Sequence, residues 1–177
     1  MSDSFDPPPP PQSPGFGGAA VAGTPAEFGP RAIAYIIDIL LGFALFIAIF
    51  VFGQVVGLIS GILGAIVTTL GFLAAFLVWI YIIVMGMAVD GQTPGKRLQG
   101  IKVVQDSGEQ LGIGGAVIRL FVQGLSNSIV CGLPLGGLSM LADSETKKTI
   151  YDKILNNQAI QVEKGSITPI FPGGKPF

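Results

Sequence analysis

The sequence predicts an all-α membrane protein with two transmembrane helices, a third hydrophobic region that is broken or re-entrant, and room for a short β-hairpin in the cytoplasmic loop. Half of the 177 residues are hydrophobic and 12% are charged, whereas an ordinary soluble domain carries about 25% charged residues. Residues 39–89 contain no Asp, Glu, Lys or Arg. Because one crossing of a hydrocarbon core about 30 Å thick needs about 20 apolar residues, this stretch accommodates two crossings but not three.

The amino-terminal segment, residues 1–26, is rich in proline and glycine and includes an unbroken run of prolines at residues 7–11. Such a composition has too little apolar surface to offset the entropy lost on ordering. We therefore expect a disordered cytoplasmic tail with polyproline II character. Binding to a proline-recognition module is the alternative function for this segment.

Two apolar runs predict the membrane spans. Pro30 suits the opening turn of a helix, so the first span is predicted for about residues 30–52 and the second for about residues 65–89. The connection holds three glycines at four-residue spacing: Gly53, Gly57 and Gly61. They indicate either a glycine-rich turn or, on one helical face, close packing of helices or protomers.

The composition changes sharply after the second span. Residues 90–97 are polar and too rich in Gly and Pro to continue a helix, so residues 90–112 are predicted to form a polar loop. Within this loop, residues 101–104 indicate a short strand, one arm of a small hairpin. Lys96 and Arg97 are candidates for contact with anionic lipid phosphates at the cytoplasmic face.

A third apolar region, residues 113–142, is interrupted by polar and proline-containing sequence at 127–134. Lysine and arginine concentrate in the loop before this region and in the chain after it, which predicts that both segments lie in the cytoplasm. An even number of crossings must then separate them. We expect a re-entrant or short helical hairpin, and a single third span that sends the tail outside is the alternative.

Asp38 is the most informative residue, because it lies in the first apolar run, about 10 Å and two turns beyond Arg31 on the same helical face. A carboxylate near the bilayer centre costs roughly 2.5–3.5 kcal/mol, so the carboxylate requires compensation. Three interpretations follow: a structural ion pair with Arg31, Arg119 or a partner subunit, an ion or proton pathway, or a shallow solvated position. Arg31 is also placed to snorkel to headgroups, and Arg119 to neutralise Asp38 or hold an anionic headgroup.

The residue inventory excludes much enzyme chemistry. The chain has one cysteine and no histidine, which excludes an intramolecular disulfide, a multi-thiolate metal site and histidine-based catalysis. Residues 91–96 superficially resemble a phosphate-binding loop, but Arg97 stands where that motif requires Ser or Thr. We expect no enzymatic activity, no metal and no cofactor.

These segments together resemble the RDD family of small bacterial multi-pass membrane proteins, named for one arginine and two aspartates. Residues 31–38 match the family's opening, and residues 91–104 match its glycine and lysine segment. Arg119 resembles the arginine that opens the third region, and Asp152 resembles the second aspartate. The resemblance covers about residues 28–162.

The resemblance implies a transmembrane domain over residues 27–163 and leaves residues 164–177 as a flexible tail. Where the family commonly has a Gly-Thr pair, this chain has Asn156 and Asn157 nearby, and asparagine can still adopt the left-handed backbone that glycine supplies. The family implies a location in the bacterial plasma membrane, and we expect a cytoplasmic amino terminus.

Two hypotheses for function follow. In the first, the protein transports a small ion or solute, with Asp38 as the membrane carboxylate and with Arg31, Arg119 and Asp152 tuning it. In the second, it is a non-catalytic accessory or scaffolding subunit of a larger membrane complex. The expected partners are membrane lipids and either further copies of the chain or other membrane proteins, without nucleic acid.

Overall fold

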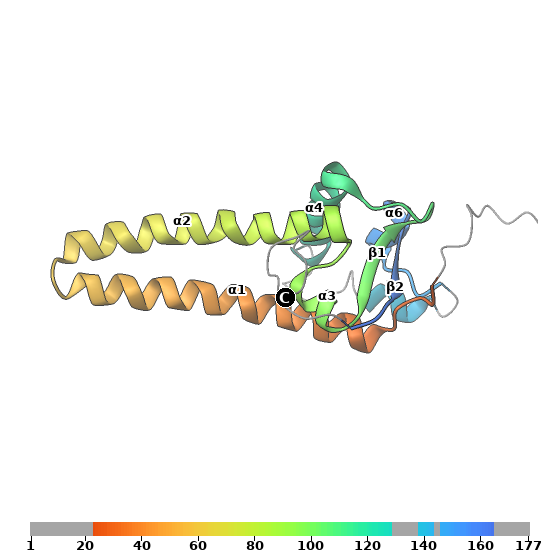
Figure 1. Ribbon diagram of the computed structural model, residues 1–177, viewed down its shortest axis with the longest axis horizontal. Coiled ribbons are helices and arrows are strands. Elements are labelled where there is room, and N and C mark those ends of the chain that lie inside the picture. The colour runs from red at the N-terminus through yellow and green to blue at the C-terminus, as the bar shows by residue number, and fades with distance from the viewer. Residues whose placement is uncertain (1–22, 129–137, 144–145, 165–177) are drawn as a thin grey trace, which may run out of the picture.

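A computed structural model describes residues 23–128, 138–143 and 146–164. Two long helices, α1 (Phe28–Gly57) and α2 (Gly61–Met85), form a hairpin that projects from a wider domain (Figure 1). The remaining described elements are short, in chain order η1 (Gly86–Asp90), α3 (Pro94–Leu98), β1 (Ile101–Gln105), α4 (Gly112–Ser128), η2 (Ser139–Ala142), α6 (Ile150–Ile154) and β2 (Asn157–Gln161).

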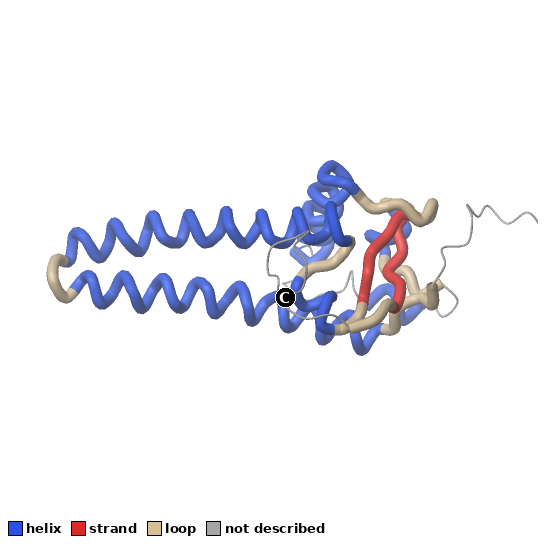
Figure 2. Tube along the Cα trace, in the orientation of Figure 1, coloured by secondary structure: helices blue, strands red, loops and turns tan. Residues whose placement is uncertain are grey.

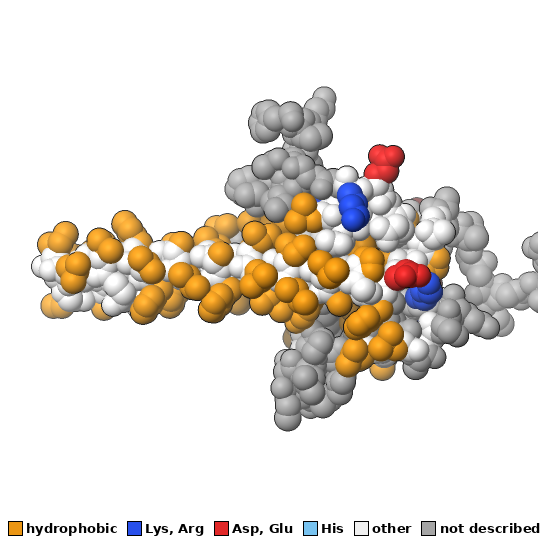
Figure 3. All heavy atoms as spheres, turned by 90° about the horizontal axis from the view of Figure 1, so that it is seen from below, with side chains coloured by type: hydrophobic (Ala, Val, Ile, Leu, Met, Phe, Trp, Pro, Cys, Tyr) orange, Lys and Arg blue, Asp and Glu red, His pale blue; other side chains and the backbone are white. Residues whose placement is uncertain are grey.

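The hairpin has the length and composition of a membrane-spanning pair. The apolar segments Phe28–Gly57 and Gly61–Asp90 are both long enough to cross a bilayer. Hydrophobic side chains cover the surface of the hairpin, while the charged side chains in view lie on the wider domain (Figure 3). Apolar surface this extensive needs a nonpolar environment, which agrees with the two predicted spans.

Both helices extend further toward each other than the predicted spans, because the glycines of the connection are helical. Only residues 58–60 separate α1 from α2, and the Ser60 hydroxyl caps α2 by accepting from the Leu63 backbone amide. Gly57 and Gly61 therefore lie at the two helix ends that flank the turn, and not in the turn itself. The two helices pack on each other along their length (Figure 1).

Small residues bring the two helices together near this turn. Gly53 lies against the Thr68 side chain. Gly57 lies against Gly64 so closely that a Cβ added at Gly64 would be 2.5 Å from the Gly57 Cα. Gly61 faces open space. Gly53 and Gly57 thus contact α2 within the chain, whereas Gly61 begins α2 and does not share a helical face with them.

The chain leaves α2 through a sequence of local turn signals. After the π-helical turn η1, Gly91 adopts a left-handed backbone with φ of 69°. Thr93 then caps α3, its hydroxyl accepting from the Lys96 backbone amide, and Pro94 fills the first helical turn. This turn brings α3 back onto α1.

The short hairpin predicted inside the loop is wrong, because the partner of β1 comes from the far end of the chain. Strands β1 and β2 pair antiparallel, with Val103 opposite Ala159, and the two-stranded sheet lies in the wider domain (Figure 2). The class is therefore mostly helical with a small sheet. Local pattern identified β1 but carried no signal for a partner more than 50 residues away.

The predicted tail, residues 1–26, is ordered in its last part. The Ala26 amide donates to the Ala159 carbonyl at 2.9 Å, and the Gln161 amide donates to the Thr24 carbonyl at 2.8 Å. These residues extend the sheet along the free edge of β2. Residues 1–22 and the tail after residue 164 lie outside the described residues.

The third apolar region begins with α4, which packs on η1, α2 and α6. The predicted break at residues 127–134 lies almost wholly outside the described residues, so re-entry stays a prediction. Beneath α4, a buried core joins the sheet to the start of α1 and the end of α2: Ala34, Val84, Met87, Ile101, Val103 and Ala116.

Candidate functional site

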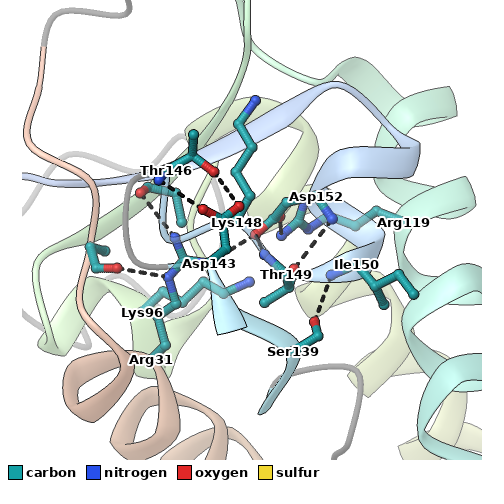
Figure 4. Close-up of polar contacts among 12 residues, drawn as sticks. Arg31, Lys96, Arg119, Ser139, Asp143, Thr146, Lys148, Thr149, Ile150 and Asp152 are labelled. Atoms are coloured by element: carbon teal, nitrogen blue, oxygen red, sulfur yellow. Dashed lines mark hydrogen bonds and ion pairs between the residues drawn. The ribbon is translucent and has the colours of Figure 1, made fainter. Parts of the chain in front are cut away.

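Asp152 is the centre of a buried ion-pair cluster in the wider domain (Figure 4). Its side chain is fully buried, and its two oxygens accept from Arg31 at 2.8 Å and from Arg119 at 2.5 Å. Thr149 and Asp152 form a reciprocal cap at the start of α6: the Asp152 amide donates to the Thr149 hydroxyl, and the Thr149 amide donates to the carboxylate. A short helix thus presents one carboxylate to two arginines.

Arg31 joins the first helix to the sheet. Besides Asp152, its guanidinium donates to the carbonyls of Ala26 and Ala159, each at 3.2 Å. Five donors in a rigid fork allow one arginine to hold a carboxylate and two carbonyls together. Arg31 therefore fixes the start of α1 against β2 and α6.

Arg119 reaches the same carboxylate from α4. Its side chain is buried, and its guanidinium lies over the Tyr151 ring, 5.2 Å from the centroid. Among the described residues, the buried Nε of Arg119 has no hydrogen-bond partner. This arginine therefore retains an unused donor beside the cluster.

The charge of Asp152 is stabilised by these neighbours. Burial by itself raises its pKa, but the Arg119 and Arg31 guanidiniums and the hydrogen bonds from Thr149 more than offset burial, so the pKa lies below its ordinary value. Asp152 stays ionised at neutral pH and forms ion pairs with both arginines.

Asp38 lies outside this cluster. Its carboxylate accepts from the Thr93 hydroxyl at 2.5 Å and from the Gly95 backbone amide at 2.7 Å. An ion pair of Asp38 with Arg31 or Arg119, one of the interpretations from the sequence, is therefore wrong within the chain: both arginines pair with Asp152 instead. Asp38 holds the first turn of α3 against α1.

Gly95 permits this contact. A Cβ at Gly95 would collide with the Ala34 carbonyl and lie 2.9 Å from the Asp38 carboxylate. The backbone of α3 can reach the α1 carboxylate only because residue 95 has no side chain.

Lys96 and Arg97 point to different surroundings. Arg97 pairs with Asp90 at 2.7 Å. The Lys96 ammonium contacts the Met87 sulfur at 3.3 Å and lines a cavity beside the arginines. The Lys96 side chain thus turns inward to the cavity, and contact of Lys96 and Arg97 with lipid phosphates stays a prediction.

The cavity has a volume of about 340 Å³ and lies between α1, α2, α4 and the sheet. Its polar lining includes Arg31, Asp38, Lys96 and Arg119. Apolar side chains form most of the remaining wall: Tyr35, Ile36, Ile39, Trp79, Ile83 and Leu120. A cavity with this size and mixed lining is typical of small-molecule sites.

Lys96 carries the least compensated charge of the cavity. Burial and the positive charge of Arg119 lower its pKa to about 8, against the opposing influence of Asp38 and Asp152. Among the described residues, Lys96 forms no ion pair. Its ammonium is available to a ligand.

The structure therefore brings four predicted residues, Arg31, Asp38, Lys96 and Arg119, to one cavity, with Asp152 behind it. Pattern analysis missed the residues that position them. Thr93 before Pro94 and Thr149 three residues before Asp152 were available as helix-cap signals. Trp79 carried no local signal, because its place on the wall depends on how α2 packs against α1.

Comparison with known proteins places these residues in context. The model of the RDD family matches residues 25–156. The chain is 35% identical over 81 residues to an uncharacterized protein, YckC, of Bacillus subtilis; the matched part covers 45% of this chain and 54% of that protein. The chain thus spans about half the length of this curated relative. No solved structure matches the chain.

Proposed function

The chain belongs to the RDD family of small bacterial membrane proteins, and from this premise we propose that it binds a small anionic solute in the cavity and takes part in moving it across the membrane. The proposed role is binding and transport rather than catalysis, and the site uses no metal or cofactor. We propose the plasma membrane as its location.

The observation that carries this proposal is the balance of charge at the cavity. Arg31, Lys96 and Arg119 line it, and among the described residues two carboxylates lie near them, Asp38 and Asp152. One positive charge is in excess among these five groups, and Lys96 is the cation among them that has no ion-pair partner within the described residues. Because an uncompensated charge in a partly dehydrated site is costly, an anion beside Lys96 is favoured and a cation is disfavoured.

The contacts of Asp38 argue against its use as a cation ligand. Both carboxylate oxygens already accept hydrogen bonds, one from Thr93 and one from Gly95. A cation that bound Asp38 would have to share the carboxylate with these two donors and would meet the positive charge of Lys96. We therefore propose that Asp38 positions Lys96 for the anion.

The sheet supports a topology for this protein. Residues 24–26, β1 and β2 form one hydrogen-bonded unit, so all three segments belong to the same side of the membrane. An even number of crossings then separates β1 from β2. With lysine-rich sequence in the same unit, we propose that this side, with the amino terminus, is cytoplasmic.

Tryptophan fluorescence provides the test, because Trp79 is the sole tryptophan and lies on the cavity wall. Titration of the detergent-solubilised protein with acetate, sulfate and inorganic phosphate should change the emission of Trp79 in a saturable way. Lys96→Ala should lower the affinity for the anion by at least about tenfold, which is a loss of roughly 1.4 kcal/mol of binding free energy. Lys153→Ala, a change at an exposed lysine, should leave it unaltered.

A response to metal cations and none to any anion would refute the anionic site. Anion uptake into proteoliposomes then tests transport separately from binding. Uptake that Lys96→Ala abolishes, with the fold intact by circular dichroism, is the expected result.

An accessory role in a larger complex is the second candidate, and the hairpin favours it. Two helices with apolar side chains around their outer surface enclose no passage among the described residues. A transport path then requires further copies of the chain or a partner protein. Native mass spectrometry after gentle extraction should show a homo-oligomer for a transporter, whereas a defined foreign partner would favour the accessory role.

A further inference from the structure

We infer that the anion in this cavity is the phosphate group of a membrane phospholipid with a net negative headgroup, and that its acyl chain lies along the apolar wall. This inference rests on the proposed anionic site and assigns its ligand class. Three features of the described residues carry it: the depth of the cavity, the exposure of its wall and the arrangement of its charges.

The depth follows from the length of α1. Beyond Asp38, α1 continues for 19 residues, from Ile39 to Gly57, which is about 28 Å of helix. This nearly equals the thickness of the hydrocarbon core, about 30 Å. If the apolar end of the hairpin crosses the core, Asp38 and the cavity lie at the level of the phospholipid phosphates.

The wall of the cavity is continuous with the outer apolar surface of the protein. Ile36 and Ile39 line the cavity and yet are 54% and 50% exposed, and Leu120 on α4 is 37% exposed. These side chains therefore belong both to the site and to the surface that the hairpin presents to lipid. A ligand with a hydrocarbon chain can occupy the wall and extend along the hairpin.

The charges lie together at one part of the lining. Lys96 is near enough to Arg31, Arg119, Asp38 and Asp152 to be influenced by each of them. Among the described residues, the Lys96 ammonium has only a thioether partner and the Arg119 Nε beside the cluster is unpaired. A phosphate offers several strong acceptor oxygens for such donors.

A free inorganic anion fits this lining less completely. It would contact the donors but would leave the apolar wall, which includes Ile36, Ile39 and Leu120, without a bound hydrocarbon chain. An amphipathic phosphate satisfies both parts of the cavity, because its chain removes apolar surface from water while its headgroup meets the cations.

The test compares three probes by Trp79 fluorescence on the full chain in a nonionic detergent: short-chain phosphatidylglycerol, short-chain phosphatidylcholine and inorganic phosphate. Phosphatidylglycerol should bind at least about tenfold more tightly than either of the others. Phosphatidylcholine has the same chains without net charge, and inorganic phosphate has the charge without chains.

Two variants separate the headgroup from the chain. Lys96→Ala should weaken phosphatidylglycerol binding, and Ile36→Ala should weaken it without changing the response to inorganic phosphate. Phe43→Ala, at an exposed residue of α1 outside the cavity lining, is the control and should bind as the wild type does.

The outcomes distinguish this inference from the proposed function. Equal binding of inorganic phosphate and phosphatidylglycerol, with both lost in Lys96→Ala, would overturn the lipid assignment and keep the anionic site. Equal binding of the two lipids would also overturn it, because the headgroup charge would be irrelevant. No response to any of the three probes would overturn the anionic site as well.

Discussion

At the scale of single residues, the three residues that name the family have distinct structural roles. Arg31 and Asp152 form part of one buried cluster that joins α1, β2 and α6, while Asp38 docks α3 on α1. Both aspartates therefore act first as positioning residues. Their contacts place the cationic side chains Arg119 and Lys96 at the cavity.

Replacing Asp152 by asparagine should destabilise the protein strongly. Asparagine keeps the size of the side chain but removes the charge that compensates two buried guanidiniums. Breaking a buried ion pair in this way typically costs about 3–5 kcal/mol. Chemical or thermal unfolding in detergent, followed by circular dichroism, measures the loss.

Glu27→Gln is the matched control, because Glu27 also pairs with a cation but at an exposed position. It should change the stability little, because solvent screens an exposed ion pair. The pH dependence of the free energy of unfolding gives a second measure of the role of Asp152. Since the pKa of Asp152 is lowered in the folded protein, its contribution is present above the unfolded value of about 3.9 and is lost as pH falls through the folded value. A wild type that is no less stable in acid than at neutral pH would contradict this role.

Anion binding should weaken as pH rises above about 8. Lys96 has a pKa lowered to about 8 by burial and by Arg119, so it loses its proton, and with it the attraction for the ligand, well below the ordinary lysine range. Titration of Trp79 fluorescence with a phosphate-bearing probe between pH 6 and about 10 should show affinity falling toward about tenfold per pH unit above that pKa. Lys96→Arg should flatten the profile, because arginine stays protonated throughout.

At the scale of elements, the hairpin owes its close packing to residues without side chains. A Cβ on Gly64 would lie 2.7 Å from the Gly57 nitrogen and 2.9 Å from the Gly53 carbonyl oxygen. The Thr68 hydroxyl meanwhile donates to the Gly64 carbonyl at 2.8 Å, within its own helix. The two backbones can therefore approach as small residues permit in membrane helices.

Gly53→Ala should separate α1 from α2 near the turn. The added methyl group would collide with the Thr68 side chain, and overpacking of this kind costs about 1–3 kcal/mol. Gly61→Ala is the control, because nothing lies near a Cβ there. Unfolding measurements that rank both variants as equally stable would show that the glycine contact does not hold the hairpin.

At the scale of the whole molecule, a long apolar hairpin and a compact polar domain divide the chain (Figures 1 and 3). The ion-pair cluster, the cavity and the sheet all belong to the domain end of the hairpin. The proposed site therefore lies at one end of the apolar hairpin.

The hairpin should place its turn and its domain on opposite sides of the membrane. Single cysteines introduced by Ile59→Cys at the turn and by Ser107→Cys in the exposed loop after β1 report the two sides, in a chain whose Cys131 is replaced by serine. In sealed membrane vesicles, an impermeant maleimide should label only one of the two. Labelling of both from the same side would mean that the hairpin lies within one leaflet.

The sequence by itself determined the membrane class of the protein, the two apolar helices, the position of β1 and three of the charged residues that line the cavity, Arg31, Asp38 and Arg119. These features depend on hydropathy and local turn chemistry, which act over a few residues. Asn156 is one more example, since its φ of 50° is the left-handed backbone expected where the family has glycine.

Only the tertiary structure decided which charges meet. Arg31 and Asp38 lie on one helical face, so sequence spacing favoured contact between them, but Arg31 pairs with Asp152, 121 residues away. The strand that pairs with β1 and the inward direction of the Lys96 side chain could not be predicted from local sequence either. Each depends on how distant elements dock, and the physical reason is that a buried charge is compensated by whichever opposite group the packing brings near, not by its neighbour in the chain.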